Sequence, residues 1–404
     1  MAKRKKRSPG QVFKNLVLIL LVLSCTYTFL VYTDVPFISK WRTIYIETAM
    51  TTFTHKWLAT AFIPKVIIEE TMGYALENDL EQESLSTDSY WHISKPHTDT
   101  AFIKNDKKDD QSFSKNNPDF KKAYPEIDIQ TLDEYMSEHK DDSYVDDYLW
   151  IDAADTNDAD TGIRTTSGDR VLVLDTKNGI VIVMRKTGDF VARMAIIKDP
   201  SRVSLAVSPN YGRSGANIAD ICKKSDAVLG INASGFDDPG GKGVGAYPYG
   251  LCISGKTKYT SSVGGTYKMT GFTESDTLMI GSYNDTSIFR DAVEFKPILV
   301  LDGQRVVEGS AGWGVQPRSA IGQTKNGEVL LLIVDGRAPG YSIGATMQEI
   351  AEFMLEYNAY QAINLDGGSS SIMYYNGRII TKPSAGDKKN GRLLPDAFIV
   401  SPAL

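Results

Sequence analysis

Histidine is scarce in this 404-residue chain, and its distribution limits the chemistry available. The four histidines all precede residue 140: His55, His92, His97 and His139. The part of the chain after residue 140 therefore has no histidine of its own to act as the base of a Ser-His-Asp hydrolase. Histidine-based catalysis there would require the N-terminal part to fold back onto it.

Several other sequence patterns are missing. No G-x-x-x-x-G-K-[ST] motif occurs, which excludes a P-loop. The net charge of −6 argues against a nucleic-acid partner. No cofactor is required by the sequence; no EF-hand loop occurs, although a divalent cation among the Asp and Asn side chains stays open. Cys222 and Cys252 do not have metal-ligand spacing, and either a disulfide or two free thiols fits them.

A long uncharged run lies near the N-terminus. Residues 15–33, NLVLILLVLSCTYTFLVYT, follow a basic cluster at residues 3–7 and have about the length needed to cross a bilayer. A cleaved signal peptide is the alternative, but it would have a shorter apolar core and an A-x-A site, which is missing here. We therefore expect a single-pass membrane protein with residues 1–14 as a basic cytoplasmic tail, 15–33 as signal anchor and the C-terminal domain extracytoplasmic.

Residues 34–162 have the composition of a connecting region. Apolar residues are spaced as in a helix up to Pro64, which predicts a stalk or membrane-surface helix with no catalytic role for His55. From about residue 76 the chain is polar and acidic with little periodicity, which predicts a poorly ordered spacer. A short helix is expected at residues 130–139.

The remaining residues, 163–404, read as one α+β domain. Strand-like runs are joined by turn pairs at Asn178-Gly179, Asp302-Gly303, Asn326-Gly327 and Asn376-Gly377. Such hairpins predict largely antiparallel sheets. Helices at residues 216–224 and 347–357 are expected to pack on the sheet faces. Thr346 and Glu349 form the T-x-x-E pattern of a capping box, which favours a structural role for Glu349.

Four glycine-bearing segments in this domain adjoin strands and carry polar residues. Acidic and amide side chains without histidine suit glycosyl transfer, in which carboxylates handle water or a developing positive charge. An arginine in the same place suits a phosphate group, which its planar fork binds through two hydrogen bonds. A sugar-linked phosphodiester would leave with little need for protonation.

The segments LGINASGF, VQPRSAIGQTKNGEVLLLIVDGR, QAINLDGGSSSIMYYNGR and LPDAFIV occur in this order. Together they resemble the phosphodiester glycosidase family over roughly residues 163–404. The resemblance implies removal of a sugar whose anomeric carbon is attached to phosphate. Its motifs map onto residues 232–236, 317–320, 335–337 and 364–370. In the first of them, Ala233 and Ser234 replace glycines of the family pattern.

The resemblance and the residue chemistry together give the candidate site. The expected catalytic residues are Asp366 as first choice of carboxylate, Asp335 as second, and Arg318 for the phosphate. The expected substrate-binding residues are Asn232, Phe236, Asn364, Gly367, Gly368, Ser369 and Arg337. Asn232 and Asn364 bind sugar hydroxyls or brace the acids, and Arg337 alternatively forms an ion pair with Asp335. Tyr247, Tyr249 and Trp313 either stack on the face of a sugar ring or only pack in the core or at the rim.

The function expected from the sequence is an extracytoplasmic hydrolase acting on sugar-1-phosphodiester linkages in cell-wall, capsule or exopolysaccharide material. Its partners would be a glycan or sugar-phosphate substrate and the membrane. One alternative is a non-catalytic exported module that binds phosphorylated glycans during exopolysaccharide assembly, which the altered first motif keeps open. Another is a phosphodiesterase that cleaves on the other side of phosphorus.

Overall fold

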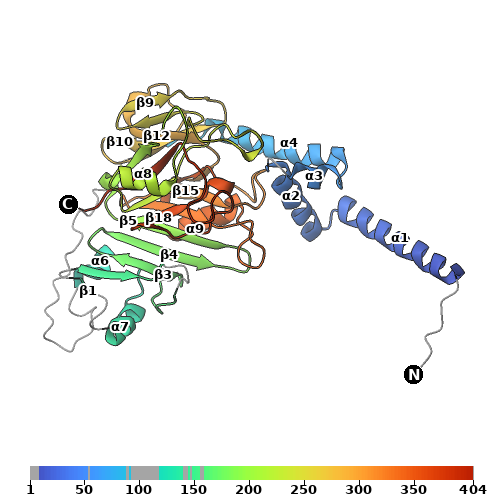
Figure 1. Ribbon diagram of the computed structural model, residues 1–404, viewed down its shortest axis with the longest axis horizontal. Coiled ribbons are helices and arrows are strands. Elements are labelled where there is room, and N and C mark those ends of the chain that lie inside the picture. Colours follow the sequence, from blue (N-terminus) through green and yellow to red (C-terminus); the bar gives the residue numbers. More distant parts are fainter. Residues whose placement is uncertain are drawn as a thin grey trace.

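A computed structural model describes residues 9–52, 55–87, 91, 118–139, 144–145, 148–154 and 159–403 (Figure 1). The α-helices are α1 (Pro9–Tyr32), α2 (Pro36–Met50), α3 (Lys56–Thr60), α4 (Lys65–Glu81), α6 (Pro118–Ala123), α7 (Ile129–Glu138), α8 (Ile218–Lys224) and α9 (Met347–Glu356). The 3-10 helices are η1 (Gln82–Ser84), η2 (Pro200–Arg202), η3 (Pro239–Gly241), η4 (Thr286–Ile288) and η5 (Gly368–Ser370).

The strands form three sheets in which all described pairs are antiparallel, as predicted. The first sheet has the order β1 (Tyr144–Val145), β2 (Tyr148–Asp152), β3 (Arg170–Asp175), β4 (Ile180–Lys186), β5 (Val191–Ile197), β16 (Val329–Val334), β15 (Arg318–Thr324), β17 (Ala359–Leu365), β13 (Ile298–Leu301), β14 (Gln304–Arg305). The second is β11 (Leu278–Gly281), β10 (Lys268–Thr273), β12 (Phe289–Phe295), β8 (Cys252–Ser254), β9 (Thr257–Thr260). The third is β19 (Arg378–Ile379), β18 (Met373–Tyr375), β7 (Leu229–Asn232), β20 (Asp396–Val400), β6 (Val203–Val207).

The α+β class is therefore confirmed, and its local signals are the expected ones. The four turn pairs join β3 to β4, β13 to β14, β15 to β16 and β18 to β19. The helix predicted at 347–357 is α9, and Thr346 and Glu349 form its capping box. Both of those side chains serve the helix end, which confirms the structural interpretation of Glu349.

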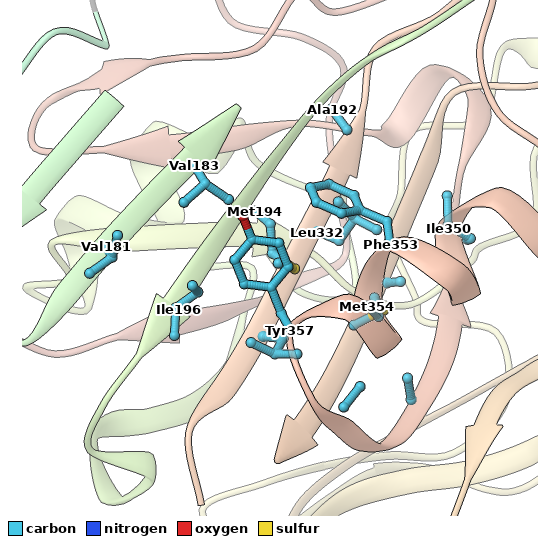
Figure 2. Close-up of a cluster of buried hydrophobic side chains, with 14 of the residues drawn as sticks. Val181, Val183, Ala192, Met194, Ile196, Leu332, Ile350, Phe353, Met354 and Tyr357 are labelled. Carbon is cyan, nitrogen blue, oxygen red and sulfur yellow. The ribbon is translucent and has the colours of Figure 1, made fainter. Parts of the chain in front are cut away.

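The large sheet is buried on both faces. Helix α9 packs on one face, where Ile350, Phe353 and Met354 meet Val183 and Leu332 of the central strands (Figure 2). On the opposite face, alternate residues of the same strands pack against the third sheet and parts of the second. Burial on both faces accounts for the nearly continuous apolar runs of β16 and β5. The central strands are thus fixed rigidly, and their ends can hold a site in place.

The helices α2, α3 and α4 pack together and connect α1 to the domain (Figure 1). Pro64 precedes α4 as its N-cap residue, but the helix predicted to run up to Pro64 is already interrupted between α2, which ends at Met50, and α3, which begins at Lys56. Helix α1 is long and apolar enough to cross a membrane, a property that a signal sequence shares. The basic residues 3–7 lie outside the described residues.

The region predicted as stalk and spacer is not wholly separate from the domain. Strand β2 pairs with β3, and Leu132 and Met136 of α7 lie in the core beneath the large sheet. The side chain of Gln82 hydrogen-bonds the backbone of Ile298 in β13 in both directions. The residues of this region that pack on the domain are few and lie between acidic runs, so the composition of the region did not predict their contacts. The division at residue 162 itself stays a prediction.

The two cysteines of the domain are free thiols in the structure. Cys222 and Cys252 are both buried, and neither forms a disulfide. The Sγ atom of Cys252 lies 3.5 Å from a carboxylate oxygen of Asp396. The alternative of two buried thiols therefore applies.

Candidate functional site

A cavity of about 620 Å³ is lined by the ends of β15 and β17 in the large sheet, by the end of β12 in the second sheet, by loops next to the third sheet and by the segment between α2 and α3. Its charged lining residues are Asp238, Asp366, Arg318, Arg337 and Arg392. Further lining residues include Phe236, Asn364, Gly367, Gly368, Ser369, Tyr249 and Trp313. Eight of the ten predicted site residues thus line one cavity. Asn232 and Asp335 do not.

Asp366 lies directly after β17, at the end of a strand held by β15 on one side and β13 on the other. Burial raises the pKa of its carboxyl group to about 7, and a hydrogen bond from Ser370 and the charge of Arg392 oppose this rise only partly. A carboxyl group with a pKa near neutrality can exchange a proton with water or substrate at working pH. This is the property that the catalytic assignment requires.

Asn232 braces Asp366 rather than facing the cavity. It is fully buried, and its amide Nδ2 donates to the backbone oxygen of Asp366 at 2.5 Å. Its Oδ1 accepts hydrogen bonds from the Ser319 hydroxyl at 2.9 Å and from the Ile372 backbone amide at 3.2 Å. Both ends of this amide are therefore used within the protein. Of the two roles considered for Asn232, the geometry favours bracing.

Arg318 begins β15 and is almost fully buried. Its Nε donates to the Ala345 carbonyl at 2.9 Å, and its Nη2 donates to the carbonyls of Trp313 and Gly314. Burial, together with the neighbouring charge of Arg337, lowers the pKa of Arg318 to about 9. Nη1 forms no hydrogen bond within the described ranges. The carbonyl oxygens fix the orientation of the guanidinium group without neutralising it.

Arg337 forms the second positive group of the cavity wall. Its Nε and Nη2 donate to one side-chain oxygen of Gln316 at 3.0 and 2.8 Å. A β-carbon at Gly368 would come within 2.9 Å of its Nη2, so the glycine lets the backbone approach the guanidinium group. Neither Arg337 nor Arg318 forms an ion pair with an acidic residue that the structure describes.

Arg392 joins the remaining polar residues into one network. Its Nη1 donates to Asp238 at 2.7 Å and to the Ser369 hydroxyl at 2.9 Å, and its guanidinium lies over the ring of Phe236 at 4.4 Å. Although burial works against it, the hydrogen bond and charge of Arg392 lower the pKa of Asp238. The cavity thus holds two carboxyl groups whose pKa values are pushed in opposite directions, an arrangement typical of acid–base sites.

Asn364 and a row of aromatic rings form the least charged wall. The Nδ2 of Asn364 donates to the Lys296 carbonyl at 2.8 Å, while its buried Oδ1 has no partner among the residues described. The rings of Tyr249, Tyr267, Phe295 and Trp313 follow one another with centroid distances of 5.7, 6.1 and 6.3 Å. Aromatic faces beside a free acceptor provide what a sugar ring needs for packing and hydrogen bonding. Tyr247, the third proposed stacking residue, does not line the cavity.

Asp335 serves a different purpose from the one expected. Its carboxylate accepts from Arg193 at 2.8 Å, from the Tyr341 hydroxyl at 2.8 Å and from the Lys382 backbone amide at 2.9 Å. The pair Arg193–Asp335 is buried between β5 and the end of β16. Asp335 therefore pairs with Arg193 and not with Arg337, and the structure favours Asp366 as the reactive carboxylate.

The altered first motif folds without strain. Neither Ala233 nor Ser234 has a positive φ angle. The backbone amide and hydroxyl of Ser234 both donate to Asp396, at 2.8 and 2.6 Å. The serine that replaces a glycine of the family pattern is thus bonded to a buried acid of β20. Burial raises the pKa of Asp396 to about 6.

Comparison with known proteins shows which family this chain resembles. Residues 225–401 match the model of the phosphodiester glycosidase family. This segment contains the charged residues of the cavity wall. The predicted resemblance is confirmed.

Individual proteins also match this chain, either over a short stretch or at low sequence identity. N-acetylglucosamine-1-phosphodiester alpha-N-acetylglucosaminidase of Bos taurus is 39% identical over 70 residues, which span 17% of this chain and 13% of that protein. The Homo sapiens protein of the same name is 37% identical over 70 residues, with the same coverage. The catalytic domain of the zebrafish enzyme, described as auto-inhibited by its pro-peptide, has a TM-score of 0.46 at 20% identity. That match covers 55% of this chain and 82% of that one.

Sequence reasoning missed several residues of the cavity. Arg392 and Asp238 flank motifs of the phosphodiester glycosidase family, since Arg392 precedes the LPDAFIV segment and Asp238 follows Phe236. A charged residue next to a matched motif was the signal that could have found them. Within the described ranges, no group of three or more His, Cys, Asp and Glu residues is placed to hold a metal ion.

The helical segment before the domain also contributes to the cavity. Thr51 and Thr52 follow α2, and His55 precedes α3; all three line the rim. His55, predicted as part of a stalk or membrane-surface helix with no catalytic role, thus lines the cavity, and the absence of a catalytic role stays a prediction. The segment that contains His55 thus packs against the domain, as histidine-based catalysis there would require. His92 and His97 lie outside the described residues.

Proposed function

We propose that this protein is an extracytoplasmic, membrane-anchored glycosidase that hydrolyses sugar-1-phosphodiester linkages, with cell-wall, capsule or exopolysaccharide material as its setting. The family match of residues 225–401 supports a glycosidase-type function. The finer assignment of substrate depends on the charges of the cavity.

The observation that carries the proposal is a pair of arginines that form no ion pair with any acidic residue in the described part of the chain. Arg318 is held by carbonyl oxygens alone and Arg337 by one amide oxygen. Burying a positive charge with no ion-pair partner is costly, so such a site favours an anionic ligand, even though the charges of Glu47 and Glu349 favour the charged form of Arg318 and that of Asp366 favours the charged form of Arg337. A guanidinium fork suits the non-bridging oxygens of a phosphodiester. Asp366 lies in the wall of the same cavity.

The chemistry follows from these positions. Water attacks the anomeric carbon while Asp366, in its ionised form, takes up the proton of that water. The bond between the anomeric carbon and the phosphate oxygen breaks, and the electron pair stays on that oxygen. The phosphodiester thereby becomes a phosphomonoester dianion, whose added charge the two arginines stabilise. Asp238, kept ionised by Arg392, stabilises positive charge developing on the sugar.

A substrate assay tests this assignment. The full chain in detergent is incubated with an α-N-acetylglucosamine-1-phosphodiester in ¹⁸O-labelled water. The proposal predicts free sugar with the label on its anomeric oxygen, together with an unlabelled phosphomonoester. Label in the phosphate would instead identify a phosphodiesterase. Tight binding without any turnover would favour the non-catalytic glycan-binding module.

A further inference from the structure

Four aromatic side chains in α2, in α3 and just after α3 face solvent. Phe37 and Trp41 of α2 are 72% and 44% exposed, and Trp57 of α3 and the following Phe62 are each 55% exposed. They contact each other in two pairs, each with ring centroids 6.5 Å apart. Large aromatic residues are seldom left so exposed in proteins surrounded by water alone. Tryptophan with nearby basic residues is typical of the membrane–water interface.

The placement of these residues relative to α1 is fixed by two hydrogen bonds. Arg42 of α2 donates to the Thr33 carbonyl at 2.8 Å, just past the end of α1. The hydroxyl of Tyr27, inside α1, donates to the Phe62 carbonyl at 3.0 Å. Tyr27 lies five residues before the end of α1 at Tyr32, which corresponds to roughly 7.5 Å along the helix axis. The segment after α3 therefore lies beside the last turns of the apolar helix and not beyond them.

The same short segment forms the rim of the cavity. His55 lines the cavity, and Trp57 and Phe62 follow it across the single short helix α3. Phe62 follows His55 by seven positions, five of them in α3, and at 1.5 Å per helical residue the two lie on the order of 10 Å apart. A surface that meets Phe62 consequently lies close to the cavity mouth at His55 and Thr52.

Because this aromatic surface is continuous with α1, we expect the lipid bilayer to cover it. If α1 spans the membrane, its apolar run ends at Thr33, and a segment in contact with Tyr27 reaches the level of the lipid headgroups. The exposed side chains of Lys40 in α2, Lys56 in α3 and Lys65 at the start of α4 would then meet lipid phosphates. Binding of a second copy of the chain, or of a soluble protein, would not explain why the segment after α3 contacts the end of α1.

We propose that α2 and α3 rest in the outer bilayer surface and that the cavity takes a sugar-1-phosphodiester whose other substituent is a membrane lipid. This inference rests on the proposed function and specifies its substrate class. Water would replace the phosphate on the anomeric carbon, giving free sugar in solution and a lipid phosphomonoester in the membrane. The aromatic surface would hold the cavity mouth at the depth of the lipid-linked phosphate.

The test compares two diesters with the same sugar and phosphate. One carries a dialkylglycerol in phosphatidylcholine vesicles that contain the full-length protein, and the other carries a methyl group and is soluble. We expect a kcat/KM at least 10-fold higher for the lipid-linked diester. In the variant Trp57→Ser/Phe62→Ser this value should fall at least 10-fold, while hydrolysis of the methyl diester stays within about twofold. Tyr259→Ser, which removes an exposed aromatic on β9, is the matched control and should change neither rate.

A second readout is independent of turnover. Brominated lipids should quench part of the tryptophan fluorescence of the native protein, and Trp57→Phe should remove a part of that quenching. Equal rates on both diesters, equal losses in the double variant, or unchanged quenching in Trp57→Phe would each overturn the inference. Failure to hydrolyse either diester would count against the proposed function, and the quenching would then decide the bilayer contact alone.

Discussion

At Asp366, burial sets the protonation state on which the proposed chemistry depends. The carboxyl group lies at the end of a strand whose neighbours are fully buried, and its pKa rises to about 7. Because a general base must be ionised, turnover should be lost as the pH falls through this value. The charge of Arg392 favours the ionised form and the charge of Asp238 disfavours it. The charges around Asp366 therefore determine the pH range in which the proposed reaction should occur.

The pH profile of kcat/KM should show an acidic limb with an apparent pKa near 7. Arg392→Gln removes the positive charge and leaves Asp238 unpaired, and both changes favour the protonated form of Asp366. We expect the limb to move to higher pH by one-half to one unit, on the order of typical single-charge effects. Arg392→Lys should leave the limb closer to its native position. A profile that is flat between pH 5 and 8 would contradict a base with this pKa.

Arg337 should contribute mainly to binding of the phosphate. Arg337→Gln removes a charge that is neutralised by no acidic partner in the described structure, so folding stability should change little or improve. Affinity for inorganic phosphate or a diester, measured by calorimetry, should fall about 10- to 100-fold, since charge-assisted pairs contribute about 1.5–3 kcal/mol. Arg305→Gln, at a half-buried arginine of β14 that does not line the cavity, serves as the control. Unchanged phosphate affinity in Arg337→Gln would remove this residue from the site.

The sequence predicted eight of the residues that line the cavity but not the role of each. Asp366, Arg318 and Arg337 follow from motifs whose residue types suit a phosphodiester. Asp335 has the same Asp-Gly context as Asp366, yet its partner Arg193 lies more than 140 residues earlier in the chain. Which of two similar acids is paired depends on strand register, here that of β5 with β16, and no local pattern encodes it.

Among the elements, the loop between β14 and β15 depends most on a distant partner. Helix α2 supplies Glu47, whose buried carboxylate accepts hydrogen bonds from the Ser310 hydroxyl and the backbone amides of Gly312 and Gly314. Thr48 of the same helix hydrogen-bonds Val315 and Gln316. This loop carries the carbonyls of Trp313 and Gly314 that orient Arg318. A helix outside the family-matched segment thus supports the arginine of the site.

Glu47→Ala should loosen this loop. It leaves three buried donors unpaired, which costs about 1–3 kcal/mol for each group that no water reaches. We expect a lower Tm, faster amide exchange over residues 309–316 and weaker phosphate binding. Glu47→Gln keeps an accepting oxygen and avoids a buried charge whose pKa is raised by burial, so it should retain most of the stability. Native exchange rates in Glu47→Ala would show that α2 does not support the loop.

Elements with strong local signals were predicted well, and those fixed by distant contacts were not. The four hairpins and helices α7, α8 and α9 match turn pairs, apolar periodicity and a capping box that lie within each segment. By contrast, α2 and α3 looked like an independent stalk because their docking depends on a few residues such as Glu47 and Thr48. Some of their contacts are with glycines of the domain, whose place in the loop gives no apolar pattern: a β-carbon at Gly314 would lie 2.3 Å from the Thr48 hydroxyl oxygen.

At the scale of the whole molecule, the cavity is assembled from parts far apart in the sequence. The large sheet contributes Arg318 and Asp366, the chain near the third sheet contributes Phe236 and Arg392, and the helices that follow α1 contribute the rim. Figure 1 shows α1 projecting from the end of the molecule where α2 and α3 lie. The apolar helix, the helical rim and the charged cavity are therefore consecutive along the molecule. This arrangement is the one that the proposed lipid-linked substrate requires.

The central claim is that Asp366 catalyses cleavage of a sugar-1-phosphodiester. The most direct test is the turnover of an α-N-acetylglucosamine-1-phosphodiester by the native chain and by Asp366→Asn at pH 8. The native chain should release sugar, and the variant should lose at least about 100-fold in kcat, a typical effect of removing a general base. Because the folded-state pKa is raised, ionising Asp366 costs stability as the pH rises from about 4 through 7, so Asp366→Asn should be as stable as the native chain at pH 8, or more so. Undiminished turnover in a folded Asp366→Asn variant would contradict the account.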